Sequence, residues 1–306
     1  MRIVCRELMT LQVVSQYVEA LRFQALAATG HEQLAAARAL ATISADRFEQ
    51  GIASGLDQRR SRRQVTSAQQ LLYEAEAALE ASKLRLANLI QAEISADYEL
   101  SDIHRFFQPQ RVAASEVLRA AMDRRPDYVA AKRRVESARM NVRAARAARL
   151  PHLAFYADVG QSGRTVATTQ TTYTVQGSIV VPLYFGGRAA AEKARATAAL
   201  DEAEASLDAI RSEVEMEVRI ALSGLNSSRL QVEAASETVT IAQEEVDLSL
   251  TRFQGGVADN SEVVLAQERL ARAKQDRIRA LYNLNVARAA LHRSTGDAEK
   301  AYSKPQ

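Results

Sequence analysis

The chain has 306 residues, and its 40 basic and 37 acidic side chains leave a net charge of +3, too small to attract nucleic acid strongly. Hydrophobic residues make up 47% of the chain, yet aromatic residues make up only 5% and tryptophan is absent. Because aromatic side chains supply much of a globular core, this composition favours long helices packed through narrow seams of small residues. The single cysteine, Cys5, excludes an internal disulfide and a cysteine-based metal cluster. Apolar runs are shorter than the roughly 20 residues of a transmembrane helix, so none is expected.

Residues 1–93 are predicted to form a long helical hairpin that turns at Gly51. A heptad seam runs from Val13 to Phe48, with polar residues at three of its positions, and a second seam begins at Ser61. The turn sequence Arg-Phe-Glu-Gln-Gly-Ile-Ala at 47–53 recurs as Arg-Phe-Gln-Gly-Gly-Val-Ala at 252–258, a constant offset of 205 positions. An internal repeat of this period indicates two copies of one hairpin, the first of them incomplete at its N-terminus.

Residues 94–124 are predicted to connect the copies. They lack a helical period as far as Gln110, and a short helix follows with Ser115 as its N-cap. A longer helix within 125–151 ends before Pro151, since proline cannot continue a helix. Its basic residues favour a solvated helix face over a nucleic-acid surface, because few aromatic side chains lie beside them. They are Lys132, Arg133, Arg134, Arg139, Arg143 and Arg146.

Residues 152–187 are predicted to form a β hairpin. Apolar residues at 153, 155, 157 and 159 alternate with other residues, and the same alternation resumes at Tyr173 after the polar loop Gly160 to Thr172. Strands of about ten residues suit a membrane β-barrel, and the alternative is an exposed hairpin packed on a helix. Pro182, Gly186 and Gly187 then redirect the chain into a helix, because glycine supplies backbone freedom.

Residues 188–296 are predicted to form the second helical hairpin, with its turn at Gly256, and 297–306 a tail. A heptad seam runs without a slip from Val214 to Phe253. The arm from Arg188 to Phe253 contains no proline, and as a helix it would span roughly 100 Å, which is too long for a compact domain.

Motifs for chemistry are absent from the sequence. It has no nucleophile motif, glycine-rich phosphate loop or metal-ligand spacing, and its four histidines are scattered. We therefore predict no catalytic residue, no metal site and no cofactor, and we do not expect an enzyme.

Three features together resemble the TolC-like outer membrane efflux proteins. Arg-Pro-Asp-Tyr at 125–128 leads a helix that ends in Arg-Leu-Pro at 149–151, immediately before a strand. Val-Pro-Leu-Tyr-Phe-Gly-Gly-Arg follows the second strand at 181–188. The Arg-Phe-x-x-Gly turn occurs twice, each time with an acidic residue six positions after the glycine. The resemblance extends from about Leu11 to Gly296.

The resemblance implies a homotrimer in which helical hairpins form an α-helical barrel and each β hairpin gives a strand pair to a transmembrane β-barrel. It implies the outer membrane of a Gram-negative bacterium, with the helical part in the periplasm. Its partners would be a periplasmic adaptor (membrane fusion) protein, an inner-membrane pump and outer membrane lipid. The function implied is a passive export duct of a tripartite efflux or type I secretion system, gated at the hairpin tips. The alternative, a soluble coiled-coil scaffold, explains the seams but leaves the β hairpin unexplained.

The resemblance also assigns site residues. The tips that contact the adaptor would include Arg47, Gly51, Asp57, Arg252, Gly256 and Glu262. Phe253 lies where some relatives narrow the closed pore, and its alternative role is simple packing. Ala258 stands where such relatives can have a basic partner, so their gate-locking ion pair cannot be carried over. The arginines at 59, 60, 62 and 63 are not part of the family pattern.

Family members carry a β hairpin in each repeat, preceded by a helix and a signal peptide. The resemblance therefore implies that this chain lacks the N-terminal third of the family, namely the first ascending helix, the first β hairpin and the export signal. We expect the DNA upstream of Met1 to encode them.

Overall fold

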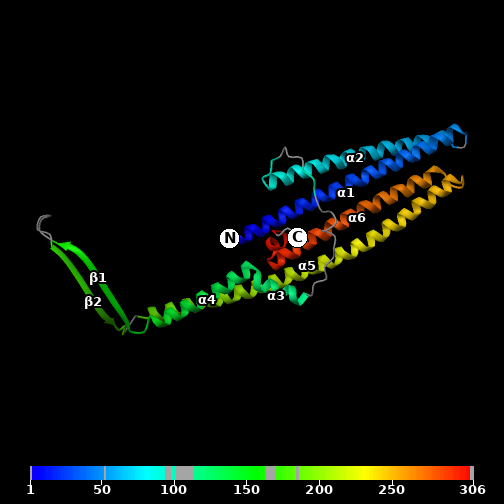
Figure 1. Cartoon of the computed structure of the whole chain (residues 1–306). Helices are drawn as coiled ribbons and strands as arrows, with labels where there is room; N and C mark the ends of the chain where they lie inside the picture. The colour runs from blue at the N-terminus through cyan, green and yellow to red at the C-terminus, as the bar shows by residue number, and fades with distance from the viewer. Residues whose placement is uncertain are drawn as a thin grey trace. The chain divides into compact units, whose positions relative to one another are not determined.

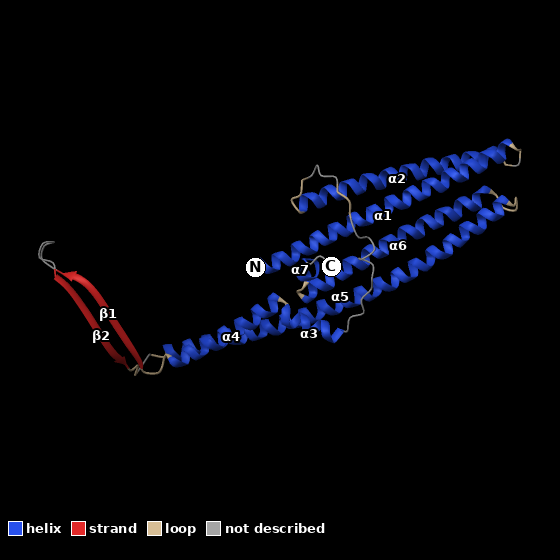
Figure 2. Ribbon diagram, in the orientation of Figure 1, coloured by secondary structure: helices blue, strands red, loops and turns tan. Residues whose placement is uncertain are grey.

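The computed structural model describes residues 2–51, 53–93, 98–100, 114–162, 170–183 and 186–303. The elements within these ranges are, in order, α1 (Arg2–Glu49), α2 (Gly55–Leu89), α3 (Ala114–Arg124), α4 (Pro126–Ala147), β1 (His152–Ser162), β2 (Gln170–Val180), α5 (Arg188–Gln254), α6 (Asn260–Thr295) and α7 (Ala298–Ser303) (Figure 1). Helices dominate, and the described strands make one antiparallel pair (Figure 2). This confirms the predicted fold class, mainly α with one β hairpin.

The chain divides into two compact units, Met1–Pro126 with Val214–Gln306, and Asp127–Glu213. In the first unit α1 and α2 run antiparallel, and α6 pairs with the adjoining part of α5. Figure 1 shows these four helices in a row, with α1 and α6 between α2 and α5. Apolar clusters such as Leu34, Ala37, Ala68 and Leu72 hold α1 against α2. No helix in the described ranges has a stretch long and apolar enough to cross a membrane.

The helix bounds reproduce the offset found in the sequence. Helix α1 ends at Glu49 and α5 at Gln254, while α2 begins at Gly55 and α6 at Asn260, so each pair is separated by 205 positions. The α5 seam is also observed, since every buried residue of α5 lies on it; these are Val214, Val218, Ser228, Ala242, Val246, Ser249 and Phe253.

The predicted seam of α1 is wrong near the tip. The sequence pattern closes it with Phe48, but this residue is 43% exposed, whereas Leu40 and Ser44 are fully buried. The reason is that α1 contacts both α2 and α6 and therefore buries a wider stripe than a two-helix seam requires.

Two smaller features also differ from expectation. Helix α3 begins at Ala114, so Ser115 lies inside its first turn and is not the N-cap. The predicted tail contains α7, to which the sequence analysis assigned no element. Most of the predicted connector lies outside the described residues.

In the second unit, α4 buries Ala131, Val135, Ala138 and Val142 at heptad spacing. An ion pair of 2.8 Å joins Arg139 on α4 to Glu204 on α5.

The strands pair in a register that puts their apolar residues on one face. Leu153 pairs with Ile179, Ala157 with Val175 and Val159 with Tyr173. The opposite face is mostly polar and pairs Tyr156 with Gln176 and Asp158 with Thr174. The ladder extends from His152↔Val180 to Ser162↔Gln170, so the ends of the predicted polar loop are strand, as β-branched Thr171 and Thr172 favour. Both faces are exposed along nearly the whole pair, so the hairpin packs on no helix among the described residues, contrary to the alternative of a hairpin packed on a helix.

Candidate functional site

The two hairpin tips have the same backbone turn. In the first tip the N–H of Gly51 donates to the carbonyl of Phe48 over 3.0 Å, and the N–H of Ala53 donates to the carbonyl of Arg47 over 3.1 Å. The same two bonds recur 205 positions later. Gly51 and Gly256 both have a φ of 73°, a left-handed conformation that favours glycine. The glycine that recurs in both copies of the turn is therefore a backbone requirement.

Asp57 and Glu262 lie in the first turns of the outgoing helices. The hydroxyl of Ser54 accepts the N–H of Asp57 over 3.3 Å, and the carboxylate of Asp57 accepts the N–H of Ser54 over 3.2 Å, which makes a capping box. In the second tip Asp259 is the N-cap and accepts the N–H groups of Ser261 and Glu262. The hydroxyl of Ser261 also donates to Asp259, and these bonds lower the pKa of Asp259 despite partial desolvation. The carboxylate of Asp57 thus caps the first outgoing helix, whereas in the second tip Asp259 caps the helix and the carboxylate of Glu262 pairs with Arg252.

Arg47 connects the two tips. Its guanidinium lies 4.6 Å from the ring centroid of Phe253 and donates to the carbonyl of the same residue. Phe253 is only 4% exposed and packs with Leu40, Val263 and Val264. This burial supports the packing role that the sequence left open for Phe253. Arg252, the repeat counterpart of Arg47, pairs instead with Glu262 of its own hairpin at 3.4 Å.

A buried polar network beside this contact was not found by sequence reasoning. The Nδ2 of Asn260 donates to the hydroxyl of Ser61 over 2.6 Å and to the carbonyl of Asp57 over 3.0 Å. The hydroxyl of Ser61 donates to that of Ser44 over 2.9 Å, and all three side chains are at most 1% exposed. The only sign of this network in the sequence was a serine, Ser61, at a position of the predicted seam. The network fixes the start of α6 to the first hairpin.

Gly186 and Gly187 have φ values of 55° and 83°, which fits their predicted role in the turn after the strands. The carbonyl of Gly187 accepts the N–H groups of Ala190 and Ala191 and so begins α5. Pro182 lies in the irregular segment after β2.

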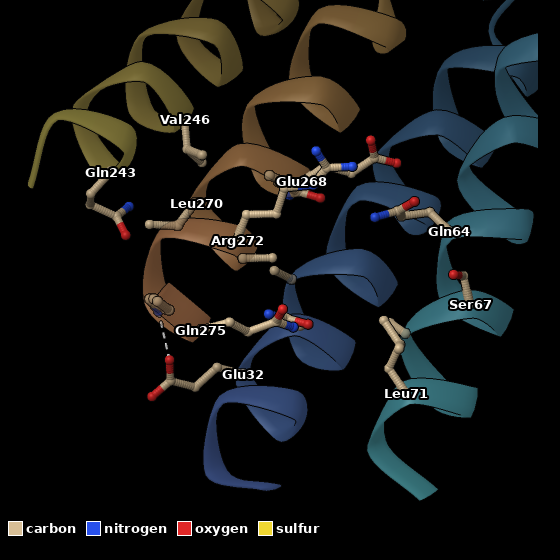
Figure 3. A pocket seen from close by; sticks show the side chains of 16 residues that line it. Glu32, Gln64, Ser67, Leu71, Gln243, Val246, Glu268, Leu270, Arg272 and Gln275 are labelled. Carbon is tan, nitrogen blue, oxygen red and sulfur yellow. Dashed lines mark hydrogen bonds and ion pairs between the residues drawn. The ribbon is translucent and has the colours of Figure 1, made fainter. Parts of the chain in front are cut away.

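Farther from the tips, a cavity of about 420 Å³ lies between the two hairpins (Figure 3). Its lining is rich in amides, namely Gln33, Gln64, Gln243, Gln267 and Gln275. Figure 3 also shows Glu32, which accepts a bond of 2.7 Å from Lys274. The lining contains no histidine or cysteine, and the described residues hold no group of three metal-binding side chains. We assign no ligand to this cavity.

Comparison with solved structures gives the class of fold. The structure is similar to the outer membrane protein VceC of Vibrio cholerae, with a TM-score of 0.71 and 19% identity over 96% of this chain and 71% of that one. At this identity the likeness shows the fold alone, which is that of a TolC-like outer membrane channel.

The sequence comparison gives the family. Residues 117–297 match the model of the family described as outer membrane efflux protein, and the chain belongs to this family. Relatives include the outer membrane efflux protein BepC of Brucella suis, 24% identical over 93% of this chain, and the alkaline protease secretion protein AprF of Pseudomonas aeruginosa, 26% identical over 95%. The chain spans 62% of the length of either relative.

Family membership confirms the resemblance stated from the sequence and the expected location, the outer membrane of a Gram-negative bacterium. The family is one of efflux proteins and not of enzymes, in agreement with the expected absence of catalysis.

Proposed function

We propose that this chain is a subunit of a trimeric outer membrane channel that exports substrates passively in a tripartite efflux or type I secretion system. The observation that carries the proposal is the β hairpin, whose register collects its apolar residues on one uncovered face. Phe155 on that face is 73% exposed, Val159 77% and Tyr173 80%. Such a face is stable against lipid, while the polar face suits a water-filled lumen.

The hairpin also supports the homotrimer. Among the described residues each strand is paired on one side only, so each leaves a row of backbone N–H and C=O groups without a strand partner there. In lipid these groups must be satisfied within protein, which requires a closed barrel. Further copies of the chain, with any strands that precede this segment in the whole protein, would supply the missing neighbours.

The tips support the proposed partners. Besides the shared turns, the second tip presents Val257 with 75% of its surface exposed, and Arg252 and Glu262 remain half-exposed. We propose that a periplasmic adaptor protein docks on these tips, at Arg47, Gly51, Asp57, Arg252, Gly256 and Glu262, and connects the duct to an inner-membrane pump. Family membership supports partners of this kind in general terms.

Gating at the tips is part of the same proposal. Phe253, the candidate for the pore constriction, is buried beneath Arg47 and would control the pore by holding the tips together. The cargo is left open, since one relative is named for protease secretion and another, OpmQ of Pseudomonas putida, for pyoverdine export.

The test uses the full-length protein. Membranes of cells that produce it are separated by density, and protein from the outer membrane fraction is sized in detergent and reconstituted into planar bilayers. We expect a trimer with discrete single-channel currents. A protein that stays in the soluble fraction and carries no current would instead be the coiled-coil scaffold.

A further inference from the structure

The internal repeat separates what a tip needs in order to fold from what it carries for another purpose. Both tips share the glycine turn, the polar N-cap and the acidic third residue of the outgoing helix. The arginines at 59, 60, 62 and 63 are not shared, because the corresponding positions 264, 265, 267 and 268 hold Val, Leu, Gln and Glu. The fold of a tip therefore does not require this arginine cluster.

Among the four arginines, Arg60 alone has an ion pair with another described residue. Arg60 lies 3.9 Å from Asp57, and its charge also contributes to lowering the pKa of Asp259 in the other tip. The side chains of Arg59, Arg62 and Arg63 are exposed, and within the described part of the chain their guanidiniums have no ion pair. Like charges three and four positions apart repel one another and weaken a helix. An acidic partner would remove this cost.

Arg59 and Arg63 occupy the outer face of α2, and Arg62 lies at its edge, about a quarter turn from the buried Ser61. The buried residues of this helix near the tip, Ser61 and Ala68, face the rest of the first unit. Positions 59 and 63 lie about half a turn away from that stripe, on the opposite side of the helix. Leu56 shares this side and is 56% exposed. The outer face of α2 is therefore basic with one exposed apolar residue.

The outer face of α5 has the complementary character. Glu244 lies about half a turn from the buried Val246, between Ile241, 54% exposed, and Leu248, 63% exposed. Asp247 lies at the edge of this face, and its carboxylate accepts a bond from the side-chain amide of Gln243. Within the described residues neither Glu244 nor Asp247 has an ion pair. This is an acidic face with exposed apolar residues.

The basic face of α2 and the acidic face of α5 lie at the same distance along their helices from the hairpin turns. Arg63 lies twelve residues after Gly51 and Glu244 twelve residues before Gly256, while Arg59 lies eight after and Asp247 nine before. The Arg47–Phe253 contact and the Asn260–Ser61 bond hold the two tips level within one copy. Because α2 and α5 are the outer helices of the row in Figure 1, the basic and acidic faces lie on its two sides.

We propose that Arg59, Arg62 and Arg63 on α2 dock against Glu244 and Asp247 on α5 of a neighbouring copy of this chain. The proposal rests on the proposed function, since it takes the copies to stand side by side with their tips level. A head-to-tail contact between opposite sides closes into a ring when the rotation from copy to copy completes a full turn, as it does in a trimer. Leu56, Ile241 and Leu248 exclude water from part of the contact, which strengthens the charge pairing. A separate acidic protein is less well supported, because this chain itself carries an acidic face at the matching height.

Disulfide trapping between copies tests the contact directly. In full-length protein with Cys5→Ser, one tagged copy carries Arg63→Cys and a second, untagged copy carries Glu244→Cys. We expect an oxidised species of twice the chain mass that a thiol reductant splits. The matched control pairs Arg63→Cys with Glu237→Cys, which lies on the same face of α5 but seven residues farther from the tip. That is about 10 Å along the helix, beyond the usual Cα separation of a disulfide.

Charge reversal tests whether the pairs matter for assembly. Arg59→Glu with Arg63→Glu places like charges in the contact and should lower the trimer-to-monomer ratio on the order of tenfold or more. Adding Glu244→Arg and Asp247→Arg to the same chain should restore the trimer.

The outcomes separate the two proposals. Wild-type protein that is not a trimer would overturn the proposed function and this contact with it. A wild-type trimer that gives no 63–244 crosslink, and whose assembly is indifferent to charge reversal, would overturn the contact alone. The contact would equally be overturned if the reversal leaves the trimer intact and instead weakens binding to an adaptor protein or to anionic lipid vesicles.

Discussion

Arg47 and Arg252 occupy equivalent positions in the two tips but have different partners. Arg47 reaches from the first hairpin to the ring and carbonyl of Phe253 in the second, whereas Arg252 pairs with Glu262 inside its own hairpin. The difference follows from position, because α1 lies against α6 and has α2 on its other side, while α5 is an outer helix of the row. At the residue scale, only the first of these arginines can couple the hairpins.

Replacement of Arg47 by alanine should therefore loosen the tips. The lost contact with the Phe253 ring and carbonyl should cost about 1 kcal/mol, and the closed channel should conduct more. Single-channel recording of the full-length protein checks the second effect. Arg252→Ala is the matched control, since it removes only a half-exposed ion pair worth at most about 1 kcal/mol before solvent screening is counted. Equal currents for wild type and Arg47→Ala would rule out this coupling role.

Asp297 gives a second prediction at this scale. Burial alone would raise its pKa, but bonds with His292 and Thr295 and the charge of Arg124 outweigh that effect and lower the pKa. The carboxylate therefore stabilises the fold above the ordinary pKa of 3.8, and this contribution is lost as the pH falls through the lower, folded value.

Thermal unfolding in detergent between pH 6 and about pH 2 measures this loss. Asp297→Asn should be less stable than wild type at pH 6, and the difference should shrink in acid. A constant difference across the whole range would show that the charge is not responsible.

At the scale of elements, the two glycine turns decide where each hairpin reverses. Gly255 and Gly256 are adjacent, but only Gly256 has a positive φ. A Cβ on either glycine would meet its neighbours no closer than 3.4 Å, so backbone conformation and not space distinguishes them.

Gly256→Ala should destabilise the protein by about 1–2 kcal/mol, because an L-residue is strained in the left-handed region. Gly255→Ala should be nearly neutral, since it avoids that strain and restricts the unfolded chain. Paired melting curves of the two variants in one detergent measure the difference. Equal melting temperatures would contradict the account of the turn.

How well the sequence predicted the buried residues of a helix depended on how that helix is packed. The periodicity of α5 identified its buried residues, because all of them lie on one heptad stripe. The periodicity of α1 failed at Phe48, because a helix between two others buries a wider stripe. The N-cap Asp259, the Asn260 network and helix α7 escaped detection, since each depends on contacts between segments far apart in sequence or on a single polar residue.

At the scale of the whole molecule, the β hairpin relates the chain to its environment. Its alternation was legible in the sequence, and the register shows that both strands place their apolar residues on the same face. The sequence did not define the ladder's end, because Gly160 to Ser162 resemble loop residues but pair as strand.

The two faces should respond differently to charge. Phe155→Arg puts a cation on the apolar face and should cost about 2–4 kcal/mol if that position lies at mid-membrane. Tyr156→Arg, one residue along, points to the polar face and should be tolerated. The yield of trimer in the outer membrane fraction distinguishes them. Equal yields would show that the apolar face does not meet lipid.

The unpaired edges of β1 and β2 have a consequence for how the protein is produced and assembled. A chain whose helices have folded but which has not yet assembled with other copies exposes two unpaired strand edges, beside apolar side chains. Any extended polypeptide nearby can pair with these edges. Native barrel assembly needs several chains in one orientation, whereas non-native strand pairing needs only two chains. Overproduction should therefore yield insoluble aggregates rich in cross-β structure, and slow synthesis should favour protein that is correctly assembled in the membrane.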